Sequence, residues 1–170
     1  RITGNSPNGT RRLICNASTG TIQVNSGELL SETYTIGIVN NGTGTIEIIE
    51  GTIMTLGNVI ENKASGTITI NGGNLTTTKS RVIINSSNGN IEINGGTLST
   101  ELSDAIRNEG TGNVIMNSGN IKITGGYSTI WNGNLGNIYI YGGTMDAGKD
   151  GSGVYNNSKG KIVIGKDDGI

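Results

Sequence analysis

The sequence contains no histidine and no phenylalanine, and only one proline and one cysteine among its 170 residues. Without histidine, the chain can form neither a catalytic triad that uses an imidazole base nor a zinc site with imidazole ligands. Because Cys15 is the only cysteine, no disulfide can form within the chain. We expect this thiol to face outward and to be free and unreactive.

Long apolar runs and clusters of like charge are also missing. No segment approaches the roughly 20 apolar residues that span a bilayer, so we expect no membrane span. The 12 basic and 13 acidic residues give a net charge of −1 without a basic stripe, which argues against nucleic acid as a partner. What the chain does have is 30 glycines and many Ile, Asn and Thr residues, a composition that favours strands and turns.

A repeat of 22 to 24 residues runs through the chain. Each unit opens with a glycine and alternating apolar residues, as in GTIQV, GTITI and GNIYI, which predicts a short strand with one buried face. A second glycine follows seven residues later, and a second short strand is then anchored by one inward Leu, Ile or Met. The units open at Gly20, Gly44, Gly66, Gly89, Gly112, Gly136 and Gly160.

Each unit closes with a third strand of the pattern Ile/Val-x-Asn. The asparagine stands two residues after the inward Ile or Val, so its side chain should also point inward. This predicts a ladder of amides that hydrogen-bond from unit to unit. A ligand-binding ridge is the alternative, but we favour a buried structural ladder because a partly satisfied polar row would be costly. The asparagines of this column are Asn16, Asn40, Asn62, Asn85, Asn108, Asn132 and Asn156.

These features predict an all-β fold, a right-handed parallel β-helix (β-solenoid) with about seven coils of 22–24 residues and three short strands per coil. We interpret residues 1–170 as a single domain. Residues 1–19 form an atypical first coil, and further coils start at residues 20, 44, 66, 89, 112, 136 and 160.

The segments GTITINGG, GNIEINGGTLST and GVYNNSKGKIVI resemble the β-helical repeats of large surface proteins of Gram-positive bacteria. More distantly they resemble the β-helices of pectate lyases and autotransporter adhesins. The resemblance extends from Ile14 to the C-terminus and implies an extracellular location on a bacterial cell surface. Because the chain begins with Arg1 rather than Met, we also expect neighbouring domains of a larger chain.

The resemblance to pectate lyases implies that an enzyme on this fold would hold Ca²⁺ with carboxylates and use a Lys or Arg base. The nearest match is a group of four aspartates that consecutive coils could bring together, Asp146, Asp150, Asp167 and Asp168. A solvated chain end is the simpler interpretation of this acidic group. We therefore expect no catalytic residues and no cofactor, with Ca²⁺ as the one possible ion.

The outward columns of the first and third strands become apolar or aromatic in the last three coils. Exposed aromatic residues often mark an interface, and such rings could also stack on sugars or cover a neighbouring coil or domain. The structural interpretation is favoured over a protein partner, and a protein partner over carbohydrate. The residues of this candidate surface are Ile115, Trp131, Tyr139, Tyr141 and Tyr155.

These observations favour a non-catalytic extracellular structural or adhesive module of a bacterial surface protein. A carbohydrate-binding module for acidic polysaccharide is the alternative, and a calcium-dependent polysaccharide lyase comes third. We expect a host protein or glycan as partner, and self-association through open strand edges at the end of the solenoid.

Overall fold

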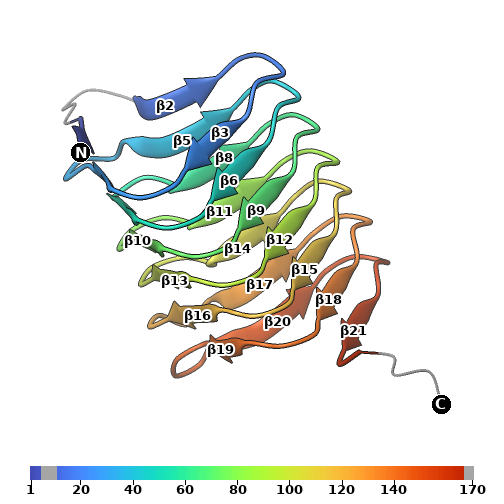
Figure 1. Cartoon of the computed structure of the whole chain (residues 1–170). Coiled ribbons are helices and arrows are strands. Elements are labelled where there is room, and N and C mark those ends of the chain that lie inside the picture. The colour runs from blue at the N-terminus through green and yellow to red at the C-terminus, as the bar shows by residue number, and fades with distance from the viewer. Residues whose placement is uncertain (5–10, 167–170) are drawn as a thin grey trace.

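The computed structural model describes residues 1–4 and 11–166 as three parallel β-sheets that wind into a β-solenoid (Figure 1). Each sheet contains seven strands, and the chain visits the three sheets in the same order in every coil. The described residues contain no helix, and hence none long and apolar enough to cross a membrane. The predicted all-β solenoid of about seven coils with three strands per coil is confirmed.

We name the sheets A, B and C. Sheet A contains β1 (Ile2–Thr3), β4 (Glu28–Leu30), β7 (Thr52–Thr55), β10 (Asn74–Thr77), β13 (Thr97–Thr100), β16 (Asn120–Ile123) and β19 (Thr144–Asp146). Sheet B contains β2 (Arg12–Asn16), β5 (Ile36–Asn40), β8 (Ile60–Asn62), β11 (Ile83–Asn85), β14 (Ile106–Asn108), β17 (Ser128–Asn132) and β20 (Ser152–Asn156). Sheet C contains β3 (Ile22–Val24), β6 (Ile46–Ile48), β9 (Ile68–Ile70), β12 (Ile91–Ile93), β15 (Val114–Met116), β18 (Ile138–Ile140) and β21 (Ile162–Ile164).

The core consists of apolar columns that run along the solenoid axis. Equivalent repeat positions pair in register, so that Ile68 lies between Ile46 and Ile91 in sheet C. All three side chains are fully buried, while the residues between the inward positions of these strands face outward. A three-residue strand has too little apolar surface to fold alone, and stacking at about 4.8 Å completes both its hydrogen bonds and its core.

The predicted asparagine ladder is confirmed. The Nδ2 of each asparagine donates to the Oδ1 of the next coil's asparagine over 2.8–3.0 Å, from Asn16 through Asn156. The same Nδ2 also donates over 2.6–2.8 Å to the carbonyl oxygen of the glycine that opens its own following repeat unit. Each amide therefore closes the turn from sheet B to sheet C and joins adjacent coils, which satisfies it inside the core.

Candidate binding surface

A cationic and aromatic column lies on the outer face of sheet B. Arg107 on β14, Trp131 on β17 and Tyr155 on β20 each precede the ladder asparagine, and strand pairing places them in consecutive register. The guanidinium carbon of Arg107 lies 3.9 Å from the centroid of the Trp131 ring, within the range of a cation–π contact. On the following turn, a Cβ on Gly133 would overlap the indole, so glycine leaves room for the ring.

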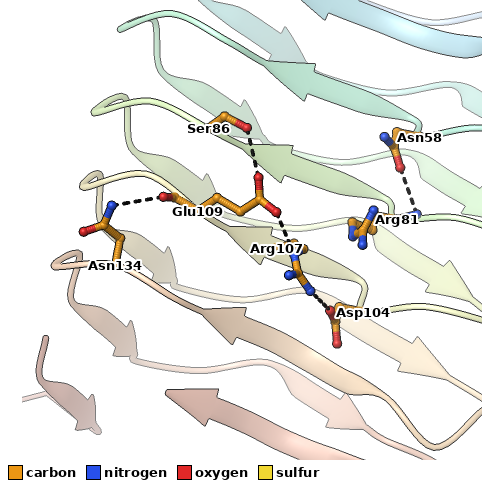
Figure 2. Close-up of polar contacts among 7 residues, drawn as sticks. All are labelled: Asn58, Arg81, Ser86, Asp104, Arg107, Glu109 and Asn134. Carbon is orange, nitrogen blue, oxygen red and sulfur yellow. Dashed lines mark hydrogen bonds and ion pairs between the residues drawn. The ribbon is translucent and has the colours of Figure 1, made fainter. Parts of the chain in front are cut away.

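Two carboxylates hold the Arg107 guanidinium in this position (Figure 2). Its Nη1 lies 3.1 Å from Asp104 Oδ2, and its Nε lies 2.8 Å from Glu109 Oε1. Asp104 is buried, and its Oδ1 accepts a hydrogen bond of 3.1 Å from the backbone N–H of Ser128. The guanidinium is thus fixed by hydrogen bonds in its own plane and by the indole across its face.

The same outer face is more buried toward the N-terminus than alternation along the strand implies. Val39 and Glu61 belong to the outward column of sheet B, yet they are 0% and 8% exposed. Asn58 Nδ2 donates to Glu61 Oε1 over 2.8 Å, and the Lys63 ammonium lies 2.9 Å from Oε2. The column is therefore covered at Val39 and Glu61 and is open at its two ends, where Cys15 and Tyr155 are exposed.

Arg81 lies beside this column (Figure 2), where its backbone N–H donates over 3.1 Å to Asn58 Oδ1. Its Nε is buried and has no hydrogen-bond partner among the described residues. The ion pairs of this face are those of Arg107 with Asp104 and Glu109 and that of Lys63 with Glu61.

The remaining residues of the predicted surface lie on sheet C. Ile115 on β15 pairs with Tyr139 on β18, and the Tyr139 and Tyr141 rings stack with centroids 6.0 Å apart and planes at 30°. The structure therefore divides the predicted surface into two groups, one on the outer face of sheet B and one on that of sheet C. Of the five predicted residues, Tyr155 presents the most accessible ring, with 48% exposure.

Only two of the four aspartates proposed for calcium fall among the described residues. Asp146 Oδ1 accepts a hydrogen bond of 3.0 Å from the backbone N–H of Gly148, and Asp150 has a positive φ of 68°. In residues 1–4 and 11–166, no group of three or more Asp, Glu, Cys or His side chains is close enough to hold a metal ion. Asp167 and Asp168 lie outside the described residues.

Two further features were not anticipated from the sequence. The first is the Asp104–Arg107–Glu109 cluster, whose only sequence signal is the placement of acids three residues before and two residues after the arginine. The second is an outer amide ladder on sheet C, in which Asn117 donates to Asn94 over 2.7 Å and Asn94 to Asn71 over 3.0 Å. Recurrence of Asn at one outward position was the available signal for this second ladder.

A groove with a volume of about 410 Å³ follows the corner between sheets C and A. It is lined by backbone and polar side chains from the four coils that open with Gly20, Gly44, Gly66 and Gly89, including Ser26, Glu50 and Asn74. The groove is therefore separate from the aromatic groups and offers mainly hydrogen-bonding partners.

Replacing Arg107 with Met is expected to lower the free energy of unfolding by about 1–2 kcal/mol. The change removes the cation over Trp131 and leaves the buried Asp104 carboxylate without its counterion. Because Trp131 is the only tryptophan, its fluorescence emission should shift as the indole loses the guanidinium. Chemical denaturation followed by tryptophan emission measures both effects, and Lys122→Met on sheet A serves as a control. An unchanged spectrum and stability would show that the Arg107 contact is incidental.

The architecture defines the chain as a β-solenoid protein. Its core combines apolar columns with one asparagine ladder, and its outer face carries ionic and aromatic groups. No protein-family model, curated protein or solved structure matches the chain.

Proposed function

We propose that the chain is a non-catalytic structural and adhesive β-solenoid module of an extracellular bacterial surface protein. The observation that carries this proposal is that outward side chains of adjacent coils contact one another along the solenoid axis. Arg107 on β14 occupies one face of the Trp131 ring on β17, so this contact joins two adjacent coils on the outside of the solenoid. Tyr139 and Tyr141 stack on one another within a single coil. The resemblance of the repeat to Gram-positive surface proteins supports the extracellular location.

The accessible part of the surface is the proposed contact point for a protein partner. Tyr155 is nearly half exposed and lies next to Trp131 on the adjacent coil. Aromatic residues of this kind contribute strongly to protein interfaces because they bury a large area with little loss of side-chain freedom.

A carbohydrate-binding module is the second candidate, and the open Tyr155 ring is the observation that favours it. Sugar rings stack on exposed aromatic faces, and the nearby Glu109 and Asn134 groups could bind hydroxyls. However, Glu109 already binds Arg107 and accepts a hydrogen bond of 3.3 Å from Ser86, while Asn134 Nδ2 donates to the Glu109 backbone carbonyl. These internal contacts favour the structural and adhesive role.

A glycan array probed with and without Ca²⁺ separates the proposals, together with a spectroscopic assay for unsaturated products from polygalacturonate. We expect neither selective glycan retention nor product release. Selective retention of polyuronates that is lost in Tyr155→Ala would favour the carbohydrate-binding role. Tyr34→Ala is a control, because Tyr34 is 60% exposed and precedes β5, which is five strands from β20 in sheet B. Calcium-dependent product release that is lost in Asp146→Asn would overturn the non-catalytic assignment.

A further inference from the structure

Five asparagines among the described residues are followed directly by glycine. Such a pair can modify itself, because the backbone nitrogen of the glycine can attack the side-chain carbonyl carbon of the asparagine. Glycine permits the attack because it has no Cβ to shield its nitrogen or to restrict the turn that brings the two atoms together. In a folded chain the reaction also requires that the glycine N–H is not held in a hydrogen bond. The five pairs begin at Asn41, Asn71, Asn88, Asn94 and Asn132.

Four of the five glycines donate this N–H to an acceptor. Three bond to a backbone carbonyl of the preceding coil, and one bonds to a serine hydroxyl in its own turn. The bonds run from Gly72 to Ile48 (3.4 Å), from Gly95 to Ile70 (3.2 Å), from Gly133 to Asn108 (3.0 Å) and from Gly89 to Ser87 Oγ (3.3 Å). Each of these bonds must break before the glycine nitrogen can turn toward the asparagine.

The same four pairs are restrained in other ways as well. Asn132 is a buried rung of the inner ladder, and Asn71 and Asn94 bond to one another over 3.0 Å in the outer ladder. The Asn88 side chain is exposed, but Gly89 is buried and its carbonyl oxygen accepts from a ladder amide over 2.8 Å. Stacking of the coils therefore fixes both partners of the reaction, or at least the glycine, at these positions.

The pair of Asn41 and Gly42 is different, because the Gly42 N–H has no hydrogen-bond partner among the described residues. The register of the repeat explains this. Asn41 follows the ladder residue Asn40, and its own N–H makes the bond to the preceding coil, to the Asn16 carbonyl over 2.8 Å. At Asn132 the asparagine is itself the ladder residue, so the following glycine makes the equivalent bond.

The Asn41 side chain is also the least restrained of those in the outer turns that make a contact. It is exposed, and its Nδ2 lies 3.6 Å from Cys15 Sγ, a weak acceptor. Arg12 Nη1 donates to the same sulfur over 3.5 Å. The amide carbon of Asn41 is therefore open both to the Gly42 nitrogen and to water.

We propose that Asn41 is a modification site at which the folded chain deamidates itself. The Gly42 nitrogen gives up its proton and forms a bond to Cγ of Asn41. The bond from Cγ to Nδ2 breaks, and Nδ2 leaves with that proton as ammonia, so that a five-membered cyclic imide remains. Water then breaks one of the two bonds between the imide nitrogen and its carbonyl carbons, which restores the N–H and yields aspartate or isoaspartate. One water is consumed and one ammonia is released, and no other reactant is required.

The modification places a carboxylate beside Arg12. Because Arg12 and Asn41 contact the same sulfur, the new negative charge forms next to the guanidinium. Arg12 belongs to β2 and Asn41 follows β5, so an ion pair between them joins adjacent coils on the outside of the solenoid. Each modified chain also carries one more negative charge than the −1 of the unmodified chain.

Peptide mass spectrometry of the wild-type chain tests the proposal. The chain is incubated in mildly alkaline buffer made with heavy-oxygen water, once folded and once in urea, and the label that enters each asparagine is followed over time. In the folded chain we expect Asn41 to react at least about fivefold faster than the other four asparagines, because their glycines must first break a hydrogen bond. In urea the five should react at similar rates. Faster reaction at any of the other four in the folded chain would overturn the proposal, and so would an Asn41 that reacts only in urea.

Isoelectric focusing of variants provides a second measure. All chains carry Asn8→Gln, because the pair of Asn8 and Gly9 lies outside the described residues. With time the parent chain should gain a more acidic band, at the position where Asn41→Asp runs before incubation. Asn41→Gln should not gain it at a comparable rate, because glutamine must close a larger and slower-forming ring, whereas the matched control Asn71→Gln should behave as the parent. An acidic band that appears equally fast in Asn41→Gln would show that another residue is the site.

Discussion

The Gly66→Ala variant is expected to unfold with a free energy about 3 kcal/mol below that of the wild type. Gly66 opens a coil, and a Cβ at this position would overlap the carbonyl oxygen of Gly44 in the preceding coil. It would also lie 2.7 Å from the Gly44 carbonyl carbon and from Asn40 Nδ2. These atoms belong to backbone and to a hydrogen-bonded ladder amide, so neither can move aside without loss of contacts, and overpacking of this kind typically costs 1–3 kcal/mol or somewhat more.

Thermal and chemical denaturation measure this effect. For a chain of this size, a loss of about 3 kcal/mol corresponds to a fall of roughly 6–12 °C in Tm. Gly20→Ala is a matched control, since Gly20 holds the same repeat position but an added Cβ there would meet only the Ser18 hydroxyl oxygen, at 3.8 Å. Measured at a concentration where the chain is monomeric, Gly20→Ala should leave Tm within about 2 °C of wild type. Equal losses in the two variants would show that the cost arises from local backbone preference and not from the approach of the preceding coil.

The coil period and the core were predictable because both derive from local alternation repeated at a fixed interval. An apolar residue at every second position identifies the inward face of a strand without knowledge of its partner. Once Ile46 and Ile68 occupy the same place in two repeats, stacking follows, and so does the ladder from Asn40 to Asn62. The repeat therefore specifies long-range contacts that a non-repetitive sequence would leave open.

The first coil was predicted less well because it does not match the repeat. Residues 1–19 were interpreted only as an atypical coil, yet Ile2 and Thr3 form a strand that pairs with Leu29 and Leu30 of sheet A. A two-residue strand has too little pattern to be identified from sequence. Its conformation depends on the unpaired edge of β4, a feature that exists only after the next coil has folded.

The candidate surface was only partly predictable. Alternation along the strands predicts which residues share an outward column, and pairing in register places Trp131 beside Tyr155. Alternation does not report what covers an outward residue. Burial of Glu61 depends on the conformations of Asn58 and Lys63, and the contact of Arg107 with Trp131 depends on the rotamers of both long side chains.

Replacing Asn85 with Leu is expected to lower the free energy of unfolding by about 3 kcal/mol. Asn85 is fully buried and accepts from Asn62 over 3.0 Å, while its Nδ2 donates to Asn108 over 2.9 Å and to the Gly89 carbonyl over 2.8 Å. Leucine has a similar volume, so the change removes hydrogen bonds without leaving a large cavity. Each buried polar group left without a partner costs about 1–3 kcal/mol, and both the Gly89 carbonyl and the Asn108 amide oxygen lose a donor.

The outer ladder supplies a matched control for this loss. Asn71→Leu makes the same chemical change and also removes two side-chain hydrogen bonds, one to Glu47 and one from Asn94. Asn71 is exposed, so water replaces both partners and the free energy of unfolding should change by less than about 0.5 kcal/mol. Urea denaturation of both variants measures the difference. If Asn85→Leu were no more destabilising than Asn71→Leu, the ladder would only accompany the stacking of the apolar columns, and burial of isoleucine would account for the stability of the rod on its own.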